Sequence, residues 1–468
     1  MIFLIGTGVL EVARKAEIGA FMIEKDFDVK EVAMKAFELM KEYDIKYNPD
    51  TPVNLDDSLA NDLYEAGLKM LLETGIYHFN THRIIKFEES EVKEALKGIR
   101  KNNGVIVGKG KDSVKIVPRK PESPIKPTIG GGTLAAPMTK DNYIELCQAY
   151  AQEPLFDLFA HYGPVEKIMG VQVRAGSALE LYVALCEISW VREALRRAGR
   201  AGMAFVTRLG ASLSPAVDDE KSGFRRTDLR IYAPSRGYLK VDDNDLFNLL
   251  HYINHGNPIL GHGFNIIGGM AGGPESTAIV VTASLIGLII QGVHIVGTGP
   301  QHVKYECHTN RESLWENSVI AQAITNNLNV PFYARANVKG GPLTPLHFKE
   351  VSAYALMAIS SGSSLIFGSR TTATLGIYNY CNPLDAKLMA EVALATPGMK
   401  REDANILVKE LLSKYEHQLA LPAEKLPKGK TFDESYDLET LKPKEESLKL
   451  YFEAKKDLEN IGVPFYES

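Results

Sequence analysis

The stretch "PESTAIVVTASLIGLIIQGVHIVG", residues 274–297, decides the fold class that the sequence predicts. Pro274 and Glu275 suit the first turn of a helix, because proline needs no N–H partner there and an acid complements the helix dipole. The apolar run breaks at Gly292, and a short β-branched segment containing His294 follows. This interruption argues against a membrane span, which needs an unbroken apolar run. We therefore expect a buried helix followed by a buried strand.

The same pattern recurs along the middle of the chain. Amphipathic helices alternate with short strand-like runs, which are EKIMGVQV (166–173), GMAFV (202–206), VHIVG (293–297), VPFYAR (330–335) and SLIFGS (364–369). Buried strands that alternate with helices form a parallel sheet. Because the repeat covers roughly 270 residues, we predict an α/β protein with a (β/α)8 TIM barrel, for which about 250 residues is typical. A doubly wound open sheet is the alternative, although no G-x-G-x-x-G follows a first strand.

Helical segments are predicted before the barrel. Apolar residues at helical spacing indicate helices over 28–43, 57–75 and 89–99. A stretch rich in glycine, proline and lysine, 107–132, is predicted to be a connection. We therefore expect the first hundred residues to be mostly helical and to lead through this connection into the barrel.

Further helices are predicted after the barrel, over 383–420 and 436–461, with a surface linker at 422–437 between them. The barrel is therefore expected to carry extra helices at both ends of the chain. We divide the chain into an N-terminal helical segment packed on the barrel, the barrel itself and a C-terminal helical extension, at 1–120, 121–400 and 401–468.

Composition places the chain among ordinary globular proteins. Of its 468 residues, 45% are hydrophobic and 24% are charged, and the net charge of −5 argues against a nucleic-acid-binding face. The four cysteines include no C-x-x-C pair, so the sequence predicts neither a disulfide framework nor a zinc ribbon. A reducing cytoplasm is the simplest location. The apolar start, residues 1–12, is too short for a membrane span and lacks the basic region of a signal peptide.

A barrel enzyme carries its site where the strands end, in the loops that lead into the helices. Guanidinium groups match the geometry of carboxylates and phosphates, so several arginines at one rim would imply an anionic ligand. Ion pairing with neighbouring acids on the surface is the alternative. The polar candidates are Arg208, Arg335, Asn337 and Arg370 at the ends of predicted strands, His302 in the segment GTGPQH (297–302) and His262 in the segment GNPILGHGFNIIGG (256–269).

Two further clusters admit a functional and a structural interpretation. The loop GGMAGGPEST, 268–277, runs into a helix start and either places N–H groups around an anion or simply needs glycine dihedrals. His262, His302, His308 and Cys307 are of types that bind zinc, but no pair has a ligand spacing on one helix face, so we predict no metal. His262 and His302 are expected to donate hydrogen bonds or to accept a proton near neutral pH.

Five stretches in the same order resemble the monomethylamine:corrinoid methyltransferases of methanogenic archaea. They are GIYHFNTHRIIKFEESEV (75–92), GGMAGGPESTAIVVTASLIGLII (268–290), GPQHVKYECHTNRESL (299–314), DAKLMAEVALATPGM (385–399) and KGKTFDESYDLETLKP (428–443). The resemblance implies a (β/α)8 barrel that assembles as a homo-oligomer and moves a methyl group from a methylamine to the cobalt of a corrinoid. It also implies that a separate small protein presents the corrinoid and that the methyltransferase itself binds no metal and no S-adenosylmethionine.

That family uses a pyrrolysine at the bottom of the barrel mouth, whose electrophilic imine is thought to bind and orient the amine. The stretch of this chain that matches it, "GMAFVTRLGASLSPA" (202–216), contains no pyrrolysine. Counting back to the family's position from the "SLS" triplet indicates Thr207, and counting forward from the glycine–methionine start indicates Val206. Neither side chain forms an imine adduct, and Arg208 is their neighbour.

The resemblance also implies changes around this position. Family members place acidic side chains and a glutamine around the pyrrolysine ring. The approximately matching positions of this chain hold Tyr232, His262 and Arg335, with Asn337 close by. Acidic groups are thus replaced by neutral and cationic ones, and a different substrate explains these joint changes.

We therefore predict a methyltransferase without pyrrolysine that acts on an N-methylated or quaternary amine, whose charged nitrogen is already a leaving group. Arginines would hold a carboxylate if the donor carries one, and aromatic rings would face the cation, although plain barrel packing is the alternative for those rings. The catalytic candidates are Thr207, Arg208, Tyr232, His262 and Arg335. The substrate-binding candidates are Phe205, Asn337, Tyr333, His302 and Arg370.

Two other functions stay open at this point, because barrels host many chemistries. One is a metal-assisted hydrolase or lyase, with its metal near His262, His302 or Cys307. The other is a non-catalytic protein that binds a small anion or a corrinoid protein.

Overall fold

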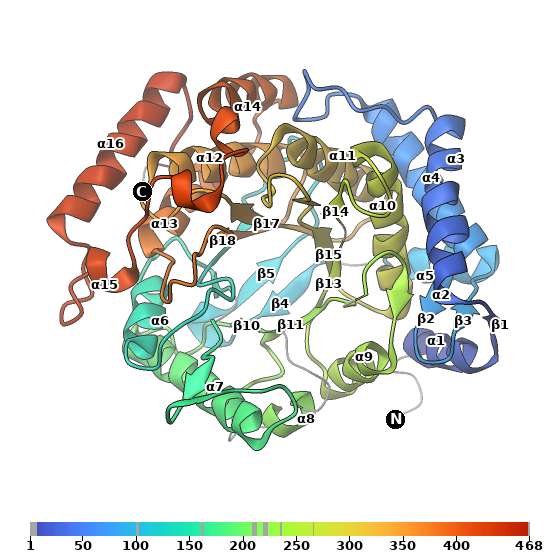
Figure 1. The fold of residues 1–468 in the computed structure, drawn as a ribbon, viewed down its shortest axis with the longest axis horizontal. Coiled ribbons are helices and arrows are strands. Elements are labelled where there is room, and N and C mark those ends of the chain that lie inside the picture. Colours follow the sequence, from blue (N-terminus) through green and yellow to red (C-terminus); the bar gives the residue numbers. More distant parts are fainter. Residues whose placement is uncertain are drawn as a thin grey trace.

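Eight parallel strands form a barrel at the centre of the molecule (Figure 1). The computed structural model describes residues 7–99, 103–160, 163–207, 213–218, 223–234, 236–264 and 266–466. A bridge between Phe159 and Phe205 joins the two ends of the eight-stranded sheet, so the barrel that the sequence predicts is confirmed. In barrel order the strands are β6 (Thr128–Gly131), β7 (Leu158–Phe159), β10 (Val206–Thr207), β11 (Leu229–Tyr232), β13 (Ile259–Gly263), β15 (Ile295–Thr298), β17 (Phe332–Val338) and β18 (Leu365–Thr371).

A helix follows each barrel strand and covers its outer side. Because strand order equals sequence order and every pair is parallel, the topology is that of a (β/α)8 barrel. The helices are α6 (Tyr143–Ala151), α7 (Ala178–Arg197), α8 (Ser214–Val217), α9 (Asp243–His255), α10 (Pro274–Gln291), α11 (Arg311–Asn327), α12 (Pro345–Ser360) and α13 (Pro383–Ala395).

The ends of α10 follow from local sequence signals. Pro274 occupies its first turn, and Gly292 after its last turn adopts a left-handed conformation with φ of 105°. The helix is long and apolar enough to cross a membrane, but 89% of it is buried inside the protein, as expected for a core helix. The buried helix and strand predicted for residues 274–297 are therefore α10 and β15.

The N-terminal elements form a second layer outside α10 and α11, on the right of Figure 1. The long helix α4 packs directly on both barrel helices. A four-stranded sheet of order β1-β3-β2-β12 lies beside this layer. The elements are α1 (Thr7–Ile18), β1 (Ala20–Phe21), α2 (Glu24–Asp26), a π-helical segment (Phe27–Met34), α3 (Lys35–Glu42), α4 (Asp57–Thr74), β2 (Ile76–His78), β3 (Arg83–Ile85), α5 (Glu89–Ile99) and β12 (Lys240–Val241).

The C-terminal helices lie against α12 and α13, at the top and left of Figure 1. Part of the segment 422–437 is buried, whereas the sequence indicated a surface linker. Phe432 is fully buried and Tyr436 nearly so, because their stacked rings pack into the core. The elements are α14 (Arg401–Tyr415), two short 3-10 turns (Glu416–Gln418 and Ala423–Lys425), α15 (Phe432–Ser435) and α16 (Glu445–Ile461).

The predicted connection at 107–132 is wrong in one respect, because it contains strands. The hairpin of β4 (Val105–Val107) and β5 (Val114–Ile116) packs among the residues that begin the barrel strands and so covers the N-terminal end of the barrel. Strand β6 ends at Gly131, where a Cβ would lie 2.1 Å from the ring of Phe156. The close approach requires glycine, and this glycine-rich strand resembles a loop in sequence.

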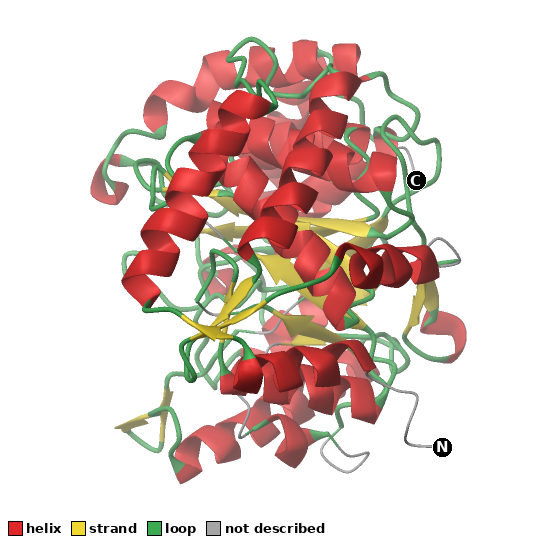
Figure 2. Ribbon diagram, turned by 90° about the vertical axis from the view of Figure 1, so that its right-hand side faces the viewer, coloured by secondary structure: helices red, strands yellow, loops and turns green. Residues whose placement is uncertain are grey.

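The predicted strand at 166–173 is also corrected. Its residues form an antiparallel hairpin of β8 (Lys167–Ile168) and β9 (Val171–Gln172) in the loop after β7. Helices surround the barrel strands in Figure 2. The barrel strand at this place is β7, which is only two residues long. So short a strand carries no periodic signal that separates it from a loop.

Alternation along β17 shows which residues face the barrel interior. Tyr333 belongs to the cluster inside the barrel, whereas Phe332, Ala334 and Ala336 pack between the strands and the outer helices. Because side chains of a strand alternate between its faces, Arg335 and Asn337 share the inner face with Tyr333. The same reasoning applied to every strand separates the side chains at the barrel mouth from those in the outer layer.

Candidate active site

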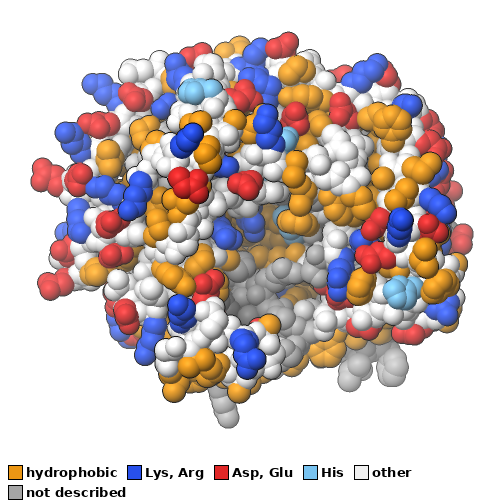
Figure 3. All heavy atoms as spheres, viewed as in Figure 1, with side chains coloured by type: hydrophobic (Ala, Val, Ile, Leu, Met, Phe, Trp, Pro, Cys, Tyr) orange, Lys and Arg blue, Asp and Glu red, His pale blue; other side chains and the backbone are white. Residues whose placement is uncertain are grey.

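The C-terminal ends of the barrel strands surround a hollow at the centre of the face seen in Figure 3. Lys or Arg and His side chains are visible inside this hollow. The polar residues at these strand ends come from β13, β17 and β18, namely His262, Arg335, Asn337 and Arg370. We refer to these four residues with Tyr333 as the mouth cluster.

His262 and Tyr333 form a hydrogen-bonded pair within the mouth cluster. Gly261 and Gly263 on either side of His262 face Val293 and Leu285 of the outer layer, so His262 faces inward. Burial raises the pKa of Tyr333 far above its ordinary value, so its hydroxyl stays protonated and shares a hydrogen bond with His262 Nδ1.

Hydrogen bonds hold the backbone of Arg335, whereas its guanidinium group forms no ion pair with a described residue. Its N–H donates to Tyr354 Oη at 3.0 Å, and its carbonyl accepts from His308 Nδ1 at 2.8 Å. Arg335 Nε is buried and has no hydrogen-bond partner in the described part of the chain. Within the described ranges, no carboxylate forms an ion pair with the Arg335 side chain. The guanidinium is therefore available to a ligand.

Arg370 lies next to Arg335 on the neighbouring strand. Arg370 is paired with Asn337 in the register of β17 and β18. Burial lowers the pKa of Arg370, and the neighbouring Arg335 charge lowers it further. Arg370 also makes no ion pair with any described carboxylate. Asn337 adds a buried amide whose Oδ1 has no hydrogen-bond partner among the residues that the structure describes. Two cationic groups and one amide thus share one part of the mouth with unused hydrogen-bonding capacity.

Two buried histidines hold the strands that carry these arginines. His308 binds the Arg335 carbonyl, and His347 Nε2 lies 2.7 Å from Ser369 Oγ, one residue before Arg370. Burial lowers the pKa of His308 to about 3 and that of His347 to about 4, so both rings are neutral near pH 7. From the sequence, His308 was expected only as a potential metal ligand, and His347 was not identified. Its position in the first turn of a predicted helix carried no signal of this contact.

Glu350 ties two loops of the mouth together. It accepts from the backbone N–H groups of Lys339 and Gly340 at 2.8 and 2.7 Å, and from the hydroxyl of Thr309. Burial raises the pKa of Glu350 to about 7. This carboxylate of α12 was not identified from the sequence. It connects the loop after β15 to the loop after β17.

Phe205 does not face the mouth, contrary to the sequence-based expectation. Its ring packs edge-on against Phe224 and beneath the guanidinium of Arg192, in the layer outside the barrel. Val206 faces the interior instead. Alternation places the fully buried Thr207 on the outer face with Phe205, so it is not a group at the mouth. Arg208 lies outside the described residues.

Tyr232 is also directed away from the mouth. Its hydroxyl donates to Gln291 Oε1 at 3.0 Å, at the end of α10, and its ring belongs to the core outside the barrel. Its neighbour Ile231 packs with the interior cluster, as the two-residue period requires. Tyr232 is therefore a packing residue, and of the three aromatic candidates only Tyr333 borders the mouth.

His302 lies in the small parallel sheet of β14 (Ile266–Ile267) and β16 (Gln301–His302). Its Nδ1 accepts from the Lys304 N–H at 3.0 Å, and its Nε2 lies 3.1 Å from Glu312 Oε2 on α11. Both ring nitrogens are thus used to hold this loop against α11. The structure does not bring His302 together with the mouth cluster.

The glycine loop 268–277 favours the structural interpretation. Gly268 and Gly272 have φ of 81° and 91°, which only glycine adopts readily. At the start of α10, Glu275 accepts from the backbone N–H of Tyr47 at 3.2 Å. An acid already occupies this helix N-terminus, which disfavours a bound anion there.

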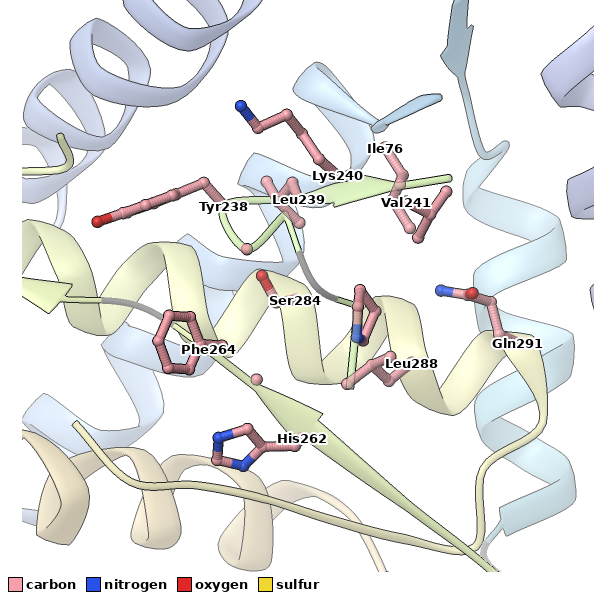
Figure 4. A pocket seen from close by; sticks show the side chains of 13 residues that line it. Ile76, Tyr238, Leu239, Lys240, Val241, His262, Phe264, Ser284, Leu288 and Gln291 are labelled. Carbon is pink, nitrogen blue, oxygen red and sulfur yellow. The ribbon is translucent and has the colours of Figure 1, made fainter. Parts of the chain in front are cut away.

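A cavity of ≈ 30 Å³ lies beside His262, between α10 and the segment 237–241 (Figure 4). Its wall includes Leu288 and Ser284 of α10, and His262 points to the opposite side of β13. This volume holds about two water molecules, since each needs roughly 10–15 Å³. The cavity is too small for a methyl donor. Among the described residues, no group of three or more His, Cys, Asp or Glu side chains is placed to hold a metal ion.

Comparisons with known proteins agree over almost the whole chain. The family model described as monomethylamine methyltransferase MtmB matches residues 7–463. MtmB1 of Methanosarcina barkeri is 29% identical over 461 residues, covering 96% of this chain and 97% of the relative. MtmB2 of Methanosarcina acetivorans is 30% identical with the same coverage.

Solved structures give the same result. The crystal structure of the Methanosarcina barkeri monomethylamine methyltransferase MtmB matches with a TM-score of 0.91 and 28% identity, covering 98% of both chains. The crystal structure of the hydroxylamine MtmB complex matches with the same values. The barrel, its outer helices and the mouth therefore all lie within one shared architecture, and this chain belongs to the monomethylamine methyltransferase MtmB family.

Proposed function

We propose that this protein moves a methyl group from an N-methylated amine to the Co(I) of a corrinoid carried by a partner protein, and that it does so without pyrrolysine. The observation that carries the proposal is membership of the methyltransferase family over residues 7–463. Curated relatives that match 96% of the chain are named monomethylamine methyltransferases. The barrel mouth, with its unpartnered polar groups, is where the methyl donor would bind.

The strand that matches the family's pyrrolysine supports a donor of a different kind. Val206 faces the barrel interior and Phe205 the outer layer, and neither side chain is electrophilic. The donor nitrogen must therefore be a leaving group on its own. A quaternary or protonated N-methyl nitrogen satisfies this, because the N–CH3 bond breaks with its electron pair staying on nitrogen, which departs as a neutral amine. The reduced corrinoid supplies the two-electron nucleophile.

The chain's own residues bind and orient the donor. The Tyr333 ring offers an aromatic face to a cationic nitrogen, which is attracted to the negative face of the ring. Tyr333 also fixes the orientation of the His262 ring through their hydrogen bond. Arg335 and Arg370 cannot stabilise an ammonium and are assigned to another part of the donor.

The rim of the mouth fits a large, flat and partly apolar partner group such as a corrin ring. Exposed apolar side chains project from the βα loops, which lie at the C-terminal ends of the strands. An apolar rim of this kind marks an interaction surface. These side chains are Met169, Val171, Phe264, Val303 and Leu375, from the loops after β7, β13, β15 and β18.

The test mixes the protein with chemically reduced cob(I)alamin and one amine at a time, and follows methylcobalamin in the visible spectrum. The amines are mono-, di- and trimethylamine, glycine betaine, choline and N-methylated amino acids. We expect methylation by at least one N-methylated donor and none without protein. The proposal would be contradicted if the folded protein transferred a methyl group from none of these amines, either to free cob(I)alamin or to the cobalt of a corrinoid protein. Methylation by monomethylamine would show that this scaffold needs no pyrrolysine even for that donor.

We also propose that the protein is cytoplasmic and assembles as a homo-oligomer. All four cysteines are free, which suits a reducing compartment. Light scattering of the purified protein measures the assembly, and a mass of one chain, 51.6 kDa, would contradict this part.

A further inference from the structure

The two arginines of the mouth cluster carry charge that nothing described in the protein neutralises. Every acid of the described chain that forms an ion pair does so with another partner, as Glu306 does with Lys339. The buried Arg335 Nε has no hydrogen-bond partner among the described residues. Charged groups away from water are normally paired, because an unpaired buried charge is strongly unfavourable. A ligand that supplies the missing charge explains why both arginines are present.

The side chains of Arg335 and Arg370 lie in the same small region of the barrel mouth. Arg335 and Asn337 share the inner face of β17, and Arg370 pairs with Asn337 across the sheet. Adjacent strands lie about 4.8 Å apart, so one ligand group can contact both guanidinium groups. Each guanidinium offers a fork of N–H donors that matches a carboxylate or a phosphate. Asn337 is 8% exposed and leaves its Oδ1 unpartnered beside them.

Charge counting restricts the ligand further. The two guanidinium groups carry two positive charges, and an N-methylammonium adds a third when the donor binds. A donor with a single carboxylate is neutral overall and leaves two positive charges uncompensated. A donor with two negative charges neutralises the arginine pair and leaves only its own ammonium, which faces the Tyr333 ring. Monomethylammonium, which has no anionic group, would meet only like charge here.

We infer that the methyl donor carries a dianionic group, a dicarboxylate or a phosphate monoester, which binds across Arg335 and Arg370. The inference deepens the proposed function, on which it rests for the N-methyl end of the donor. The dianion site itself exists independently of methyl transfer and is therefore measured by binding alone.

The first experiment measures binding to the full-length protein by calorimetry, without any corrinoid. The probes are succinate, inorganic phosphate, acetate and tetramethylammonium. We expect succinate or phosphate to bind at least tenfold more tightly than acetate, and tetramethylammonium not to bind measurably. Equal affinities for acetate and both dianions would overturn the inference, as would the absence of dianion binding.

Variants then assign the site. Arg335→Gln and Arg370→Gln are each expected to weaken dianion binding at least tenfold. The matched control is Arg197→Gln, which removes an exposed arginine on α7 that pairs with Glu193. It should leave binding unchanged. Dianion binding that survives in both mouth variants would place the ligand elsewhere and overturn the inference.

Thermal unfolding of the same variants distinguishes an arginine that binds a ligand from one that stabilises the fold. An arginine retained for a ligand has no partner in the ligand-free protein, so Arg370→Gln is expected to leave the melting temperature unchanged or to raise it. Phosphate or succinate should raise the melting temperature of the wild type and not that of Arg370→Gln. A large drop in the ligand-free variant would instead show a structural arginine.

Rates of methyl transfer distinguish a dicarboxylate donor from a phosphate monoester donor. N-methylglutamate and N-methylaspartate represent dicarboxylates, phosphocholine represents phosphate monoesters, and N-methylglycine is the monocarboxylate control. We expect one of the two classes to methylate cob(I)alamin at least tenfold faster than N-methylglycine does. Dianion binding without any methyl transfer would leave the site intact and contradict the proposed function instead. Faster transfer from N-methylglycine than from either class would overturn the inference.

Discussion

Asn337 of β17 lies opposite Arg370 of β18, whereas two residues earlier Arg335 lies opposite Phe367. Strand β17 therefore advances by two residues while β18 advances by three. This extra residue is a β-bulge, a device that redirects side chains near functional sites. Phe367 faces the barrel interior, and Ser369 turns outward to His347. The bulge thus brings Arg370, and not Ser369, to the side of Arg335.

Replacing Ser369 tests whether this bulge positions Arg370. Ser369→Ala removes the hydrogen bond to His347 Nε2 and leaves a buried ring nitrogen unpaired, so we expect a loss of about 1–3 kcal/mol in the free energy of unfolding. We also expect KM for the donor to rise several-fold with a smaller change in kcat. Ser360→Ala, at an equally buried serine that bonds only within α12, is the control. A rise in KM of equal size in this control would contradict the positioning role.

Replacing Tyr333 tests the His262 pair. Tyr333→Phe keeps the ring but frees His262 Nδ1, and small losses of orientation at a reacting centre reduce rates about tenfold to a hundredfold. We expect kcat of methyl transfer to fall by this amount. Tyr232→Phe removes the same hydroxyl in the outer layer, so it should cost about 1 kcal/mol of stability and leave kcat unchanged. A fall in kcat for Tyr232→Phe would contradict the outward placement of that residue.

Buried Glu187 predicts how stability depends on pH. Burial raises its pKa to about 8, and its Oε1 accepts from the Val165 N–H at 2.7 Å. Between its ordinary pKa and pH 8 the folded protein binds more protons than the unfolded chain, so the contribution of Glu187 to stability falls as pH rises through this window. The slope reaches about 1.4 kcal/mol per pH unit.

Glu187→Gln keeps the acceptor and removes the titration. Urea unfolding of both proteins from pH 5 to pH 8.5 should show the variant gaining stability relative to the wild type as pH rises. Parallel stability curves would show that Glu187 does not titrate in this window.

Replacing Gly299, which lies beside His308, tests whether His308 holds the backbone of Arg335 in place. A Cβ at Gly299 would lie 2.4 Å from His308 Cε1, and the buried ring has no room to move. We expect Gly299→Ala to cost about 1–3 kcal/mol of stability by overpacking and to weaken dianion binding by moving the His308 contact to the Arg335 carbonyl. Binding measured by calorimetry that is unchanged in this variant would contradict that coupling.

The control for this substitution is Gly98→Ala on α5. A Cβ at Gly98 meets no atom within 4 Å. Alanine in a helix interior is favoured over glycine by about 0.5–1 kcal/mol, so the control should be slightly stabilised with unchanged binding.

The sequence by itself determined the alternation of helices and strands, the segment 274–297 as α10 and β15, and the family resemblance that the comparisons confirm. It also placed Arg335, Asn337 and Arg370 at the ends of strands, because a polar residue directly after a buried apolar run is visible in one dimension. It did not detect β11 and β13 as strands, nor β6 and β7, which are too short or too rich in glycine for a periodic signal.

Only the tertiary structure decided which strand residues face the mouth. In a barrel both faces of every strand are buried, one inside the barrel and one beneath the helices, so apolar residues occupy both faces and no alternation is visible in the sequence. Phe205 and Tyr232 therefore looked like site residues and proved to pack in the outer layer, whereas Tyr333 faces the interior. The bulge that brings Arg370 beside Arg335 depends on pairing between strands, which no local sequence pattern specifies.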